Sequence, residues 1–188
     1  MHNIKTDIPN LILVTPDPKR DAPFAHKWFT SEYGKETLLL MGNAESEIEP
    51  STLESETATL QKFIDQEQNQ EQFTWMIRDQ NKTIGAVWIE LINTPEVKSP
   101  AVHIMIGDKD YRGKGIGKEV MGKIIQYINN NLNLRDIYSR HLASNKSAKA
   151  LLKSFGFLDD GNTYIDKNKL KWQNVHLHIC DNIKTIST

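Results

Sequence analysis

The sequence predicts a single α/β domain, and three observations support this fold class. The chain has 188 residues, a length that suits one domain with a sizeable core, and it contains no internal repeat and no linker-like stretch. Short β-branched runs alternate with segments whose apolar residues recur at helical spacing. Near the middle, the strand-like run 101–106 passes through the glycine-rich turn 111–118 directly into an amphipathic helix.

The N-terminal part of the chain predicts a strand followed by a helix. Residues 1–10 are expected to form a loose lead-in, and Leu11–Val14 is a β-branched run stopped by two prolines. Asp21 is expected to cap a helix that ends at Gly34. The run Thr37–Met41 fits either a short strand or part of a substrate loop.

A second helix and a hairpin follow. The pattern Ser51-x-x-Glu54 predicts a capping box, and the helix that it starts is expected to end near Gln72. A short polar segment, Asp79-Gln80-Asn81-Lys82, predicts a hairpin turn between two strands, residues 73–78 and 83–92.

The second half of the chain alternates strands and helices more clearly. A helix that ends at Gly156 is expected to turn Ala148, Leu151, Leu152 and Phe155 inward. The expected elements are the strand Ala101–Ile106, the helix Ile116–Asn131, the strand Asp136–Leu142, the helix Asn145–Phe155, the strands Thr163–Ile165 and Leu170–Ile179, and a polar tail over 181–188.

Charge is distributed unevenly, although the net charge is only −1. The segment Asn43–Gln72 holds eight acidic residues and one basic residue, whereas Arg112–Lys153 holds nine basic residues and two acidic ones. Two solvated helix faces would explain this pattern. An anionic cofactor on the second segment and a cationic substrate near the first would explain it equally well.

Cysteine content and hydropathy bear on the compartment. Cys180 is the only cysteine, so no intrachain disulfide is possible and a reducing compartment is expected. The apolar runs are too short for a membrane span, and no signal-peptide pattern follows Met1. These features predict a cytoplasmic protein with neither a membrane nor a nucleic acid as partner.

The glycine-rich turn is expected to bind an anion, because its N–H groups and the following helix N-terminus both favour a phosphate. A P-loop would require Gly-Lys-Ser/Thr, but Glu119 follows Gly117-Lys118. A dinucleotide fingerprint would require a glycine at Lys118 or at Val120. Both of these ligand classes are therefore disfavoured.

The turn does match Arg-x-x-Gly-x-Gly, in Arg112-Gly113-Lys114-Gly115-Ile116-Gly117. One helix and one strand later comes a second block, Asn145-Lys146-Ser147-Ala148, whose helix runs into Phe155-Gly156-Phe157. Together the two blocks resemble the acetyl-coenzyme A loop and the Asn-x-x-Ala helix of the GNAT acetyltransferases. This resemblance covers about residues 100–157. It implies one acetyltransferase domain over 1–188, with a mixed, mostly antiparallel central sheet flanked by helices on both faces.

The resemblance also implies how the co-substrate acetyl-coenzyme A is bound, without a metal. The strand before the loop separates from its neighbour, so that its backbone pairs with the pantetheine arm and the thioester oxygen. Loop amides bind the pyrophosphate, and two residues of the second block contact the cofactor arm and a phosphate. The implied cofactor-binding residues are Ile104, Met105, Ile106, Arg112, Gly113, Lys114, Gly115, Ile116, Gly117, Lys118, Asn145 and Lys149.

Two residues are candidates for the general base. Strand alternation places His103 on the opposite face from Val102 and Ile104, and imidazole titrates in the useful pH range. Glu90, on the preceding strand, is the second candidate. A half-buried strand histidine without a catalytic role, and an ordinary cross-strand glutamate, are the alternatives.

The general acid departs from the common family pattern. Many members carry a tyrosine at the position of Leu152, so protonation of the thiolate from that helix is in doubt here. Tyr138 and Tyr111 are possible replacements, although packing explains the first and loop anchoring the second. Solvent can also protonate a thiolate of pKa about 8.5.

Leu152 in place of tyrosine, together with the long N-terminal helical region, resembles the branch with ribosomal-protein N-terminal acetylases and aminoglycoside 6′-N-acetyltransferases. The run 102–117 especially resembles the aminoglycoside enzymes. The first hypothesis is an N-acetyltransferase for a small cationic amine, aminoglycoside-like or polyamine-like, with a link to antibiotic resistance. The alternatives are acetylation of a protein N-terminus or lysine, and a module that binds acetyl-coenzyme A without catalysis. The chain is expected to be a monomer, or a homodimer that pairs near Leu170–Ile179.

His176 and His178 share one face of the last expected strand. With a third ligand they would suit a metal ion. A solvent-facing pair on a terminal strand is the simpler interpretation.

Overall fold

The computed structural model describes residues 2–179. Its strands are β1 (Ile4–Lys5), β2 (Leu11–Val14), β3 (Gln72–Asp79), β4 (Lys82–Glu90), β5 (Ala101–Ile106), β6 (Asp136–Leu142), β7 (Leu158–Ile165) and β8 (Lys171–His178). Its α-helices are α1 (Pro18–Thr30), α2 (Gly34–Leu40), α3 (Leu53–Gln68), α4 (Ile116–Asn131) and α5 (Lys146–Ser154). Short 3₁₀ helices cover Glu45–Glu47 and Lys109–Tyr111.

The strands form one sheet in the order β1-β2-β3-β4-β5-β6-β8-β7. Every neighbouring pair is antiparallel except β5 and β6, which run parallel. The mixed, mostly antiparallel sheet predicted from the sequence is therefore confirmed. The short strand β1 pairs with Ile12 and Leu13, so the expectation of a loose lead-in over 1–10 was wrong at this point.

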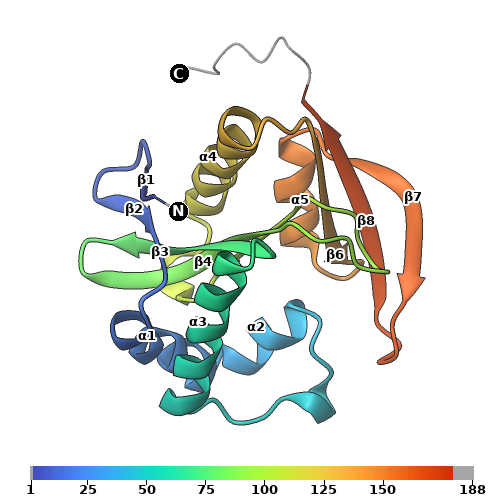
Figure 1. The fold of residues 1–188 in the computed structure, drawn as a ribbon. Helices are drawn as coiled ribbons and strands as arrows, with labels where there is room; N and C mark the ends of the chain where they lie inside the picture. The colour runs from blue at the N-terminus through green and yellow to red at the C-terminus, as the bar shows by residue number, and fades with distance from the viewer. Residues whose placement is uncertain (1, 180–188) are drawn as a thin grey trace.

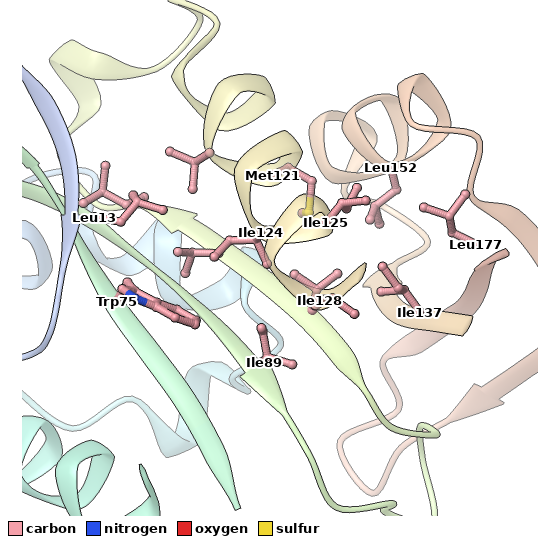
Figure 2. Close-up of a cluster of buried hydrophobic side chains, with 14 of the residues drawn as sticks. Leu13, Trp75, Ile89, Met121, Ile124, Ile125, Ile128, Ile137, Leu152 and Leu177 are labelled. Carbon is pink, nitrogen blue, oxygen red and sulfur yellow. The ribbon is translucent and has the colours of Figure 1, made fainter. Parts of the chain in front are cut away.

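Helices cover both faces of the sheet (Figure 1). On one face, α4 and α5 lie over a cluster of buried side chains that runs from Leu13 and Trp75 to Leu177 (Figure 2). On the other face, α1 and α3 pack on a smaller cluster that includes Trp28, Leu60 and Met76. Period-two alternation along β5 assigns Val102 to the first face and His103 to the second, as predicted.

The first helix begins earlier than predicted, because Asp17 rather than Asp21 is its cap. The Asp17 carboxylate accepts a hydrogen bond from the Arg20 amide, and Pro18 occupies the first turn. Asp21 is instead fully buried, where it accepts a hydrogen bond from Thr83 at 2.7 Å. The Asp21 carboxylate, predicted to cap the helix locally, therefore joins α1 to β4.

Two further helix boundaries were wrong. Residues 37–41, read as a strand or loop, lie within and just after α2, and Gly34 begins this helix instead of ending α1. The capping box of α3 is formed by Thr52 and Ser55, and the helix ends at Gln68. Ser51, the expected cap, donates to Glu56 instead.

The strand β8 lies between β6 and β7, so it offers no free edge. The expectation of an exposed pairing edge near Leu170–Ile179 was therefore wrong, and the described edges are β1 and β7. The predicted tail over 181–188 and Cys180 lie outside the described residues. No helix within residues 2–179 is both long and apolar enough to span a bilayer.

Candidate functional site

The two parallel strands separate soon after they meet. They share a single register pair, Ala101 with Tyr138, and the Ser139 hydroxyl donates to the Val102 carbonyl at 2.7 Å. Beyond Val102 no register pair joins the two strands. The backbone groups of residues 103–106 that point away from β4 therefore face a gap instead of a neighbouring strand.

A cavity of about 680 Å³ begins at this gap. One end is lined by β5, the glycine-rich loop and the first turns of α4 and α5. The other end, called the acceptor end below, is lined by six residues on the α2 side of the sheet: Glu36, Trp88, Glu90, His103, Arg140 and Trp172.

The glycine-rich loop lines the cavity beside the N-terminus of α4. Gly113 and Gly115 have φ angles of 73° and 79°, in the left-handed region that favours glycine. Among the described residues, none accepts a hydrogen bond from the N–H groups of residues 113–117. These free amides at the N-terminus of a 16-residue helix fit a pyrophosphate.

The first and last amides of the predicted phosphate-binding run already donate hydrogen bonds within the protein. The Arg112 amide donates to Lys109 at 3.1 Å, and the Lys118 amide donates to Gly115 at 3.0 Å. The set of free amides is thus shorter than the predicted run from Arg112 to Lys118.

The Arg112 side chain is committed to the protein itself. Its Nε donates to the Ile106 carbonyl at 2.9 Å, and its Nη2 donates to the Thr37 hydroxyl at 2.7 Å. Nη2 also lies 3.3 Å from the Gly107 carbonyl. Arg112 therefore joins the end of β5 to α2, and the free loop amides remain as the groups available to a phosphate.

Asn145 has a similar structural role. Its Oδ1 caps α5 by accepting from the Ala148 amide at 3.0 Å, and its Nδ2 donates to the Leu40 carbonyl of α2 at 3.3 Å. Asn145 lines the cavity, as do the other predicted cofactor residues except Lys114 and Lys149. The Lys114 ammonium lies over the Tyr111 ring, and Lys149 is exposed on α5.

The two base candidates lie side by side at the acceptor end. His103 Nε2 is 3.5 Å from Glu90 Oε1, with 13% and 25% of the two side-chain surfaces exposed. Nε2 is buried and has no hydrogen-bond partner among the described residues. The Trp88 ring, opposite His103 on β4, stacks on the imidazole with a centroid distance of 5.3 Å.

Burial raises the pKa of the Glu90 carboxyl, but the interaction with His103 and the charge of Arg140 outweigh it, so the net pKa lies below its ordinary value. Glu90 is therefore ionised at neutral pH.

Comparison with known families supports the interpretation of this geometry. Residues 10–158 match the model of the acetyltransferase (GNAT) domain, which covers most of the chain. The chain belongs to the GNAT acetyltransferase family. It is accordingly an acetyl-coenzyme A-dependent N-acetyltransferase. The part of the cavity formed by the loop and the gap is called the donor end below.

Solved structures share the fold at low sequence identity. The RimL ribosomal L7/L12 alpha-N-protein acetyltransferase with coenzyme A is 15% identical, with a TM-score of 0.76 over 94% of this chain and 98% of that one. The microcin C7 self-immunity acetyltransferase MccE with acetyl-CoA and AMP is 16% identical, with a TM-score of 0.74 over 91% and 93%. The ribosomal-protein-S5-alanine acetyltransferase from Vibrio fischeri is 17% identical, with a TM-score of 0.74 over 95% and 98%. No curated protein matches the chain by sequence.

Neither tyrosine considered as general acid is free at the GNAT site. The Tyr111 hydroxyl, which lines the cavity, donates to Asp79 at 3.0 Å, and this hydrogen bond raises its pKa. Tyr138 stacks on His176 outside the cavity lining. Leu152 lines the cavity as a buried apolar side chain. Solvent remains as the proton source considered for the thiolate.

Two cavity residues were missed from the sequence. Arg140 on β6 and Trp172 on β8 reach the cavity from elements far apart in the chain. No local motif marks them, because only the sheet order brings β8 beside β6. The acidic segment Asn43–Gln72, which was expected to attract a cationic substrate, contributes no residue to the cavity lining.

The histidine pair on β8 is held by one carboxylate. His176 Nε2 and His178 Nδ1 lie 2.8 and 2.9 Å from the same Asp136 oxygen, and both imidazoles are partly exposed. Within residues 2–179 no group of three or more possible ligands is arranged to hold a metal ion. The pair fits the simpler interpretation of a solvent-facing cluster.

Proposed function

We propose that this enzyme acetylates the primary amine of a small acceptor molecule, with His103 as the general base and Glu90 as its charged partner. One observation carries the proposal. A buried imidazole nitrogen without a hydrogen-bond partner lines the acceptor end, 3.5 Å from an ionised carboxylate. An unpartnered buried nitrogen is costly unless a ligand completes its hydrogen bond, and an amine supplies that bond.

Proton removal is the task that His103 suits. An acceptor amine is protonated near neutral pH and becomes a nucleophile only after losing that proton. His103 Nε2 accepts it, and Glu90 then stabilises the imidazolium, since the carboxylate is already ionised. Stacking on Trp88 fixes the plane of the ring.

Acetyl-coenzyme A, when bound, supplies an activated acetyl carbonyl and a thiolate leaving group. The chain holds it with the free amides of residues 113–117 and with backbone groups of residues 103–106 at the strand gap. Backbone N–H groups at such a gap also stabilise an oxyanion at the thioester carbonyl. The amine then adds to the carbonyl carbon and forms the C–N bond, and the oxyanion collapses as the C–S bond breaks. The second proton of the amine nitrogen passes to solvent, and solvent protonates the departing thiolate.

The charges of the cavity favour an acceptor with one ammonium group. Glu90 lies within the acceptor end and Glu36 is exposed at its surface. A polyamine-like or aminoglycoside-like acceptor has less support, because the acidic segment 43–72 lies away from the cavity lining. A protein N-terminus is the second candidate, since two of the similar folds are ribosomal-protein acetyltransferases.

Release of free thiol from acetyl-coenzyme A, measured with a panel of acceptors, tests the proposal. The panel contains small monoamines, amino acids, polyamines, aminoglycosides and peptides with free N-termini. We expect the highest kcat/KM with a small monoamine or an amino acid. Higher values with peptides would favour the second candidate, and higher values with polyamines or aminoglycosides would restore the polycationic acceptor.

A module that binds acetyl-coenzyme A without catalysis remains a distinct outcome. It would show saturable binding of acetyl-coenzyme A by calorimetry and no thiol release from any amine in the panel. The unpartnered His103 nitrogen argues against this outcome, because a purely binding module has no use for a base at the acceptor end.

A further inference from the structure

Two arginines line the cavity, and only one is committed to the protein. Arg112 donates to Ile106, Gly107 and Thr37. The guanidinium of Arg140, on β6, makes one hydrogen bond to the described residues, from Nη1 to the Tyr164 hydroxyl at 2.7 Å. A guanidinium carries five N–H donors, so most of those on Arg140 remain available to a ligand.

The Arg140 side chain is nevertheless held in place. Its guanidinium lies over the Trp172 ring, 5.0 Å from the centroid. Trp172 is fixed in turn by a hydrogen bond from its Nε1 to Asp166 at 2.8 Å and by stacking on Tyr164 with an interplanar angle of 7°. An arginine that is positioned before a ligand arrives binds a carboxylate or phosphate at a reduced entropic cost.

The charge of Arg140 also lacks a direct counter-ion within residues 2–179. No described carboxylate lies within ion-pair distance of its guanidinium, although Glu90 is near enough for Arg140 to lower the Glu90 pKa. A half-buried guanidinium without a counter-ion favours an anion in the adjoining space.

Strand register fixes the position of Arg140 relative to the base. Ala101 and Tyr138 are paired on the parallel strands, and His103 and Arg140 each follow two residues later. The two side chains therefore project from the same face of neighbouring strands. Because adjacent strands are about 5 Å apart and these two diverge, a molecule that spans both needs only a few bonds between its two polar groups.

We infer that the acceptor carries an anionic group, a carboxylate or phosphate, a few bonds from the amine that is acetylated, and that Arg140 binds this group. The inference rests on the proposed function and narrows its substrate class to small amphoteric amines. The N–H groups of the Arg140 guanidinium donate charge-assisted hydrogen bonds to the anionic oxygens, while His103 and Glu90 face the amine.

Matched acceptor pairs test the inference. An amino acid is compared with its amide, and O-phosphoethanolamine is compared with ethanolamine, each as kcat/KM for thiol release. The wild-type enzyme is expected to prefer the anionic member of at least one pair, and the preferred pair tells carboxylate from phosphate. The variant Arg140→Met retains an apolar side chain to pack on Trp172 but has no charge. It is expected to lose about 10- to 100-fold of that preference.

The ratio of preferences between wild type and variant cancels the intrinsic reactivity of each amine. Arg140→Lys keeps the positive charge but lacks the planar set of guanidinium donors, so its preference for the anionic compound is expected to be intermediate. The control is Arg78→Met, on β3, because Arg78 does not line the cavity. The inference would be overturned if wild type and Arg140→Met showed the same preference for the anionic compound. It would also be overturned if the variant lost kcat/KM equally on both members of a pair, because a purely structural role of Arg140 predicts that result.

A binding measurement separates this inference from the proposed function. Calorimetry with the same four compounds in the presence of coenzyme A, which carries no acetyl group, requires no turnover. We expect the Kd of at least one anionic compound to be tenfold or more lower for wild type than for Arg140→Met. If no amine is acetylated but this difference is found, the proposed catalysis fails and the anion site stands. If wild type binds neither anionic compound, the anion site is excluded.

Discussion

The two ends of the cavity are built by different chemistry. At the donor end, the binding groups are backbone amides of residues 113–117 and the unpaired edge of β5, all within one strand-loop-helix unit. At the acceptor end, they are side chains, Glu90, His103 and Arg140, from three strands, walled by Trp172 from a fourth.

This difference predicts that the two ends respond differently to substitution. A site made of backbone groups depends on glycine positions and strand geometry. A short stretch of sequence therefore determines it, and many side chains are tolerated at its other positions. A side-chain site can change its ligand by single substitutions while the fold is retained.

The largest expected effect is at the acceptor end. His103→Ala removes the proposed base, so kcat is expected to fall by about 10²- to 10⁴-fold, while acetyl-coenzyme A binding is unchanged. Steady-state kinetics across pH 5–9 and calorimetry measure both. His176→Ala, another partly exposed strand histidine outside the cavity lining, is the control. An unchanged kcat and pH profile would remove His103 from the mechanism.

The donor end is tested by a glycine substitution. Gly115→Val places a branched side chain at a φ of 79°, which costs about 1–2 kcal/mol and displaces the loop amides. The Kd of acetyl-coenzyme A is expected to rise about tenfold. Gly161→Val, at a φ of 82° in β7, imposes the same backbone strain away from the cavity. A similar Kd change in both variants would mean that strain, and not the amide positions, is responsible.

The link between the two ends is the Arg112 hydrogen bond to Thr37. A double-mutant cycle with Arg112→Met and Thr37→Val is expected to give a coupling energy of about 1 kcal/mol in unfolding free energy. The KM values for donor and acceptor are expected to rise together in Arg112→Met, since this residue holds both β5 and α2. A rise for the donor alone would confine Arg112 to the donor end.

The smallest expected effect is the pH dependence of stability from Glu90. Its folded-state pKa lies below the ordinary 4.5, so ionised Glu90 stabilises the fold above about pH 4.5. That contribution is lost as pH falls through the folded-state value. Denaturant unfolding at pH 3–6 is expected to show a flatter pH dependence in Glu90→Gln than in wild type. Glu54→Gln, at an exposed position on α3, should match wild type.

The donor end could be predicted from the sequence because its determinants are contiguous. The strand 101–106, the glycine loop and the helix 116–131 form the elements expected, and Asn145 caps α5. The acceptor end could not be predicted in the same way. Arg140 and Trp172 meet only through the order β6-β8-β7.

The errors in α1 to α3 have related causes. Asp21 fits the composition of a cap, yet its carboxylate is buried against Thr83, 62 positions later. The apolar run at 37–41 has no period that separates a strand from a short helix, and contacts from Arg112 and Asn145 hold α2 where it is. Long-range contacts thus override local preference in this part of the chain.

The separation of β5 and β6 has a mechanical consequence. The sheet consists of two ribbons, β1–β5 and β6–β8, which share one register pair at Ala101 and Tyr138 and the hydrogen bond from Ser139 to Val102, and which also meet in the core beneath α4 and α5. A donor molecule bound in the gap would contact both ribbons. Each catalytic cycle would then raise and lower the stability of the fold, because a ligand that binds only the folded protein adds its binding free energy to the fold.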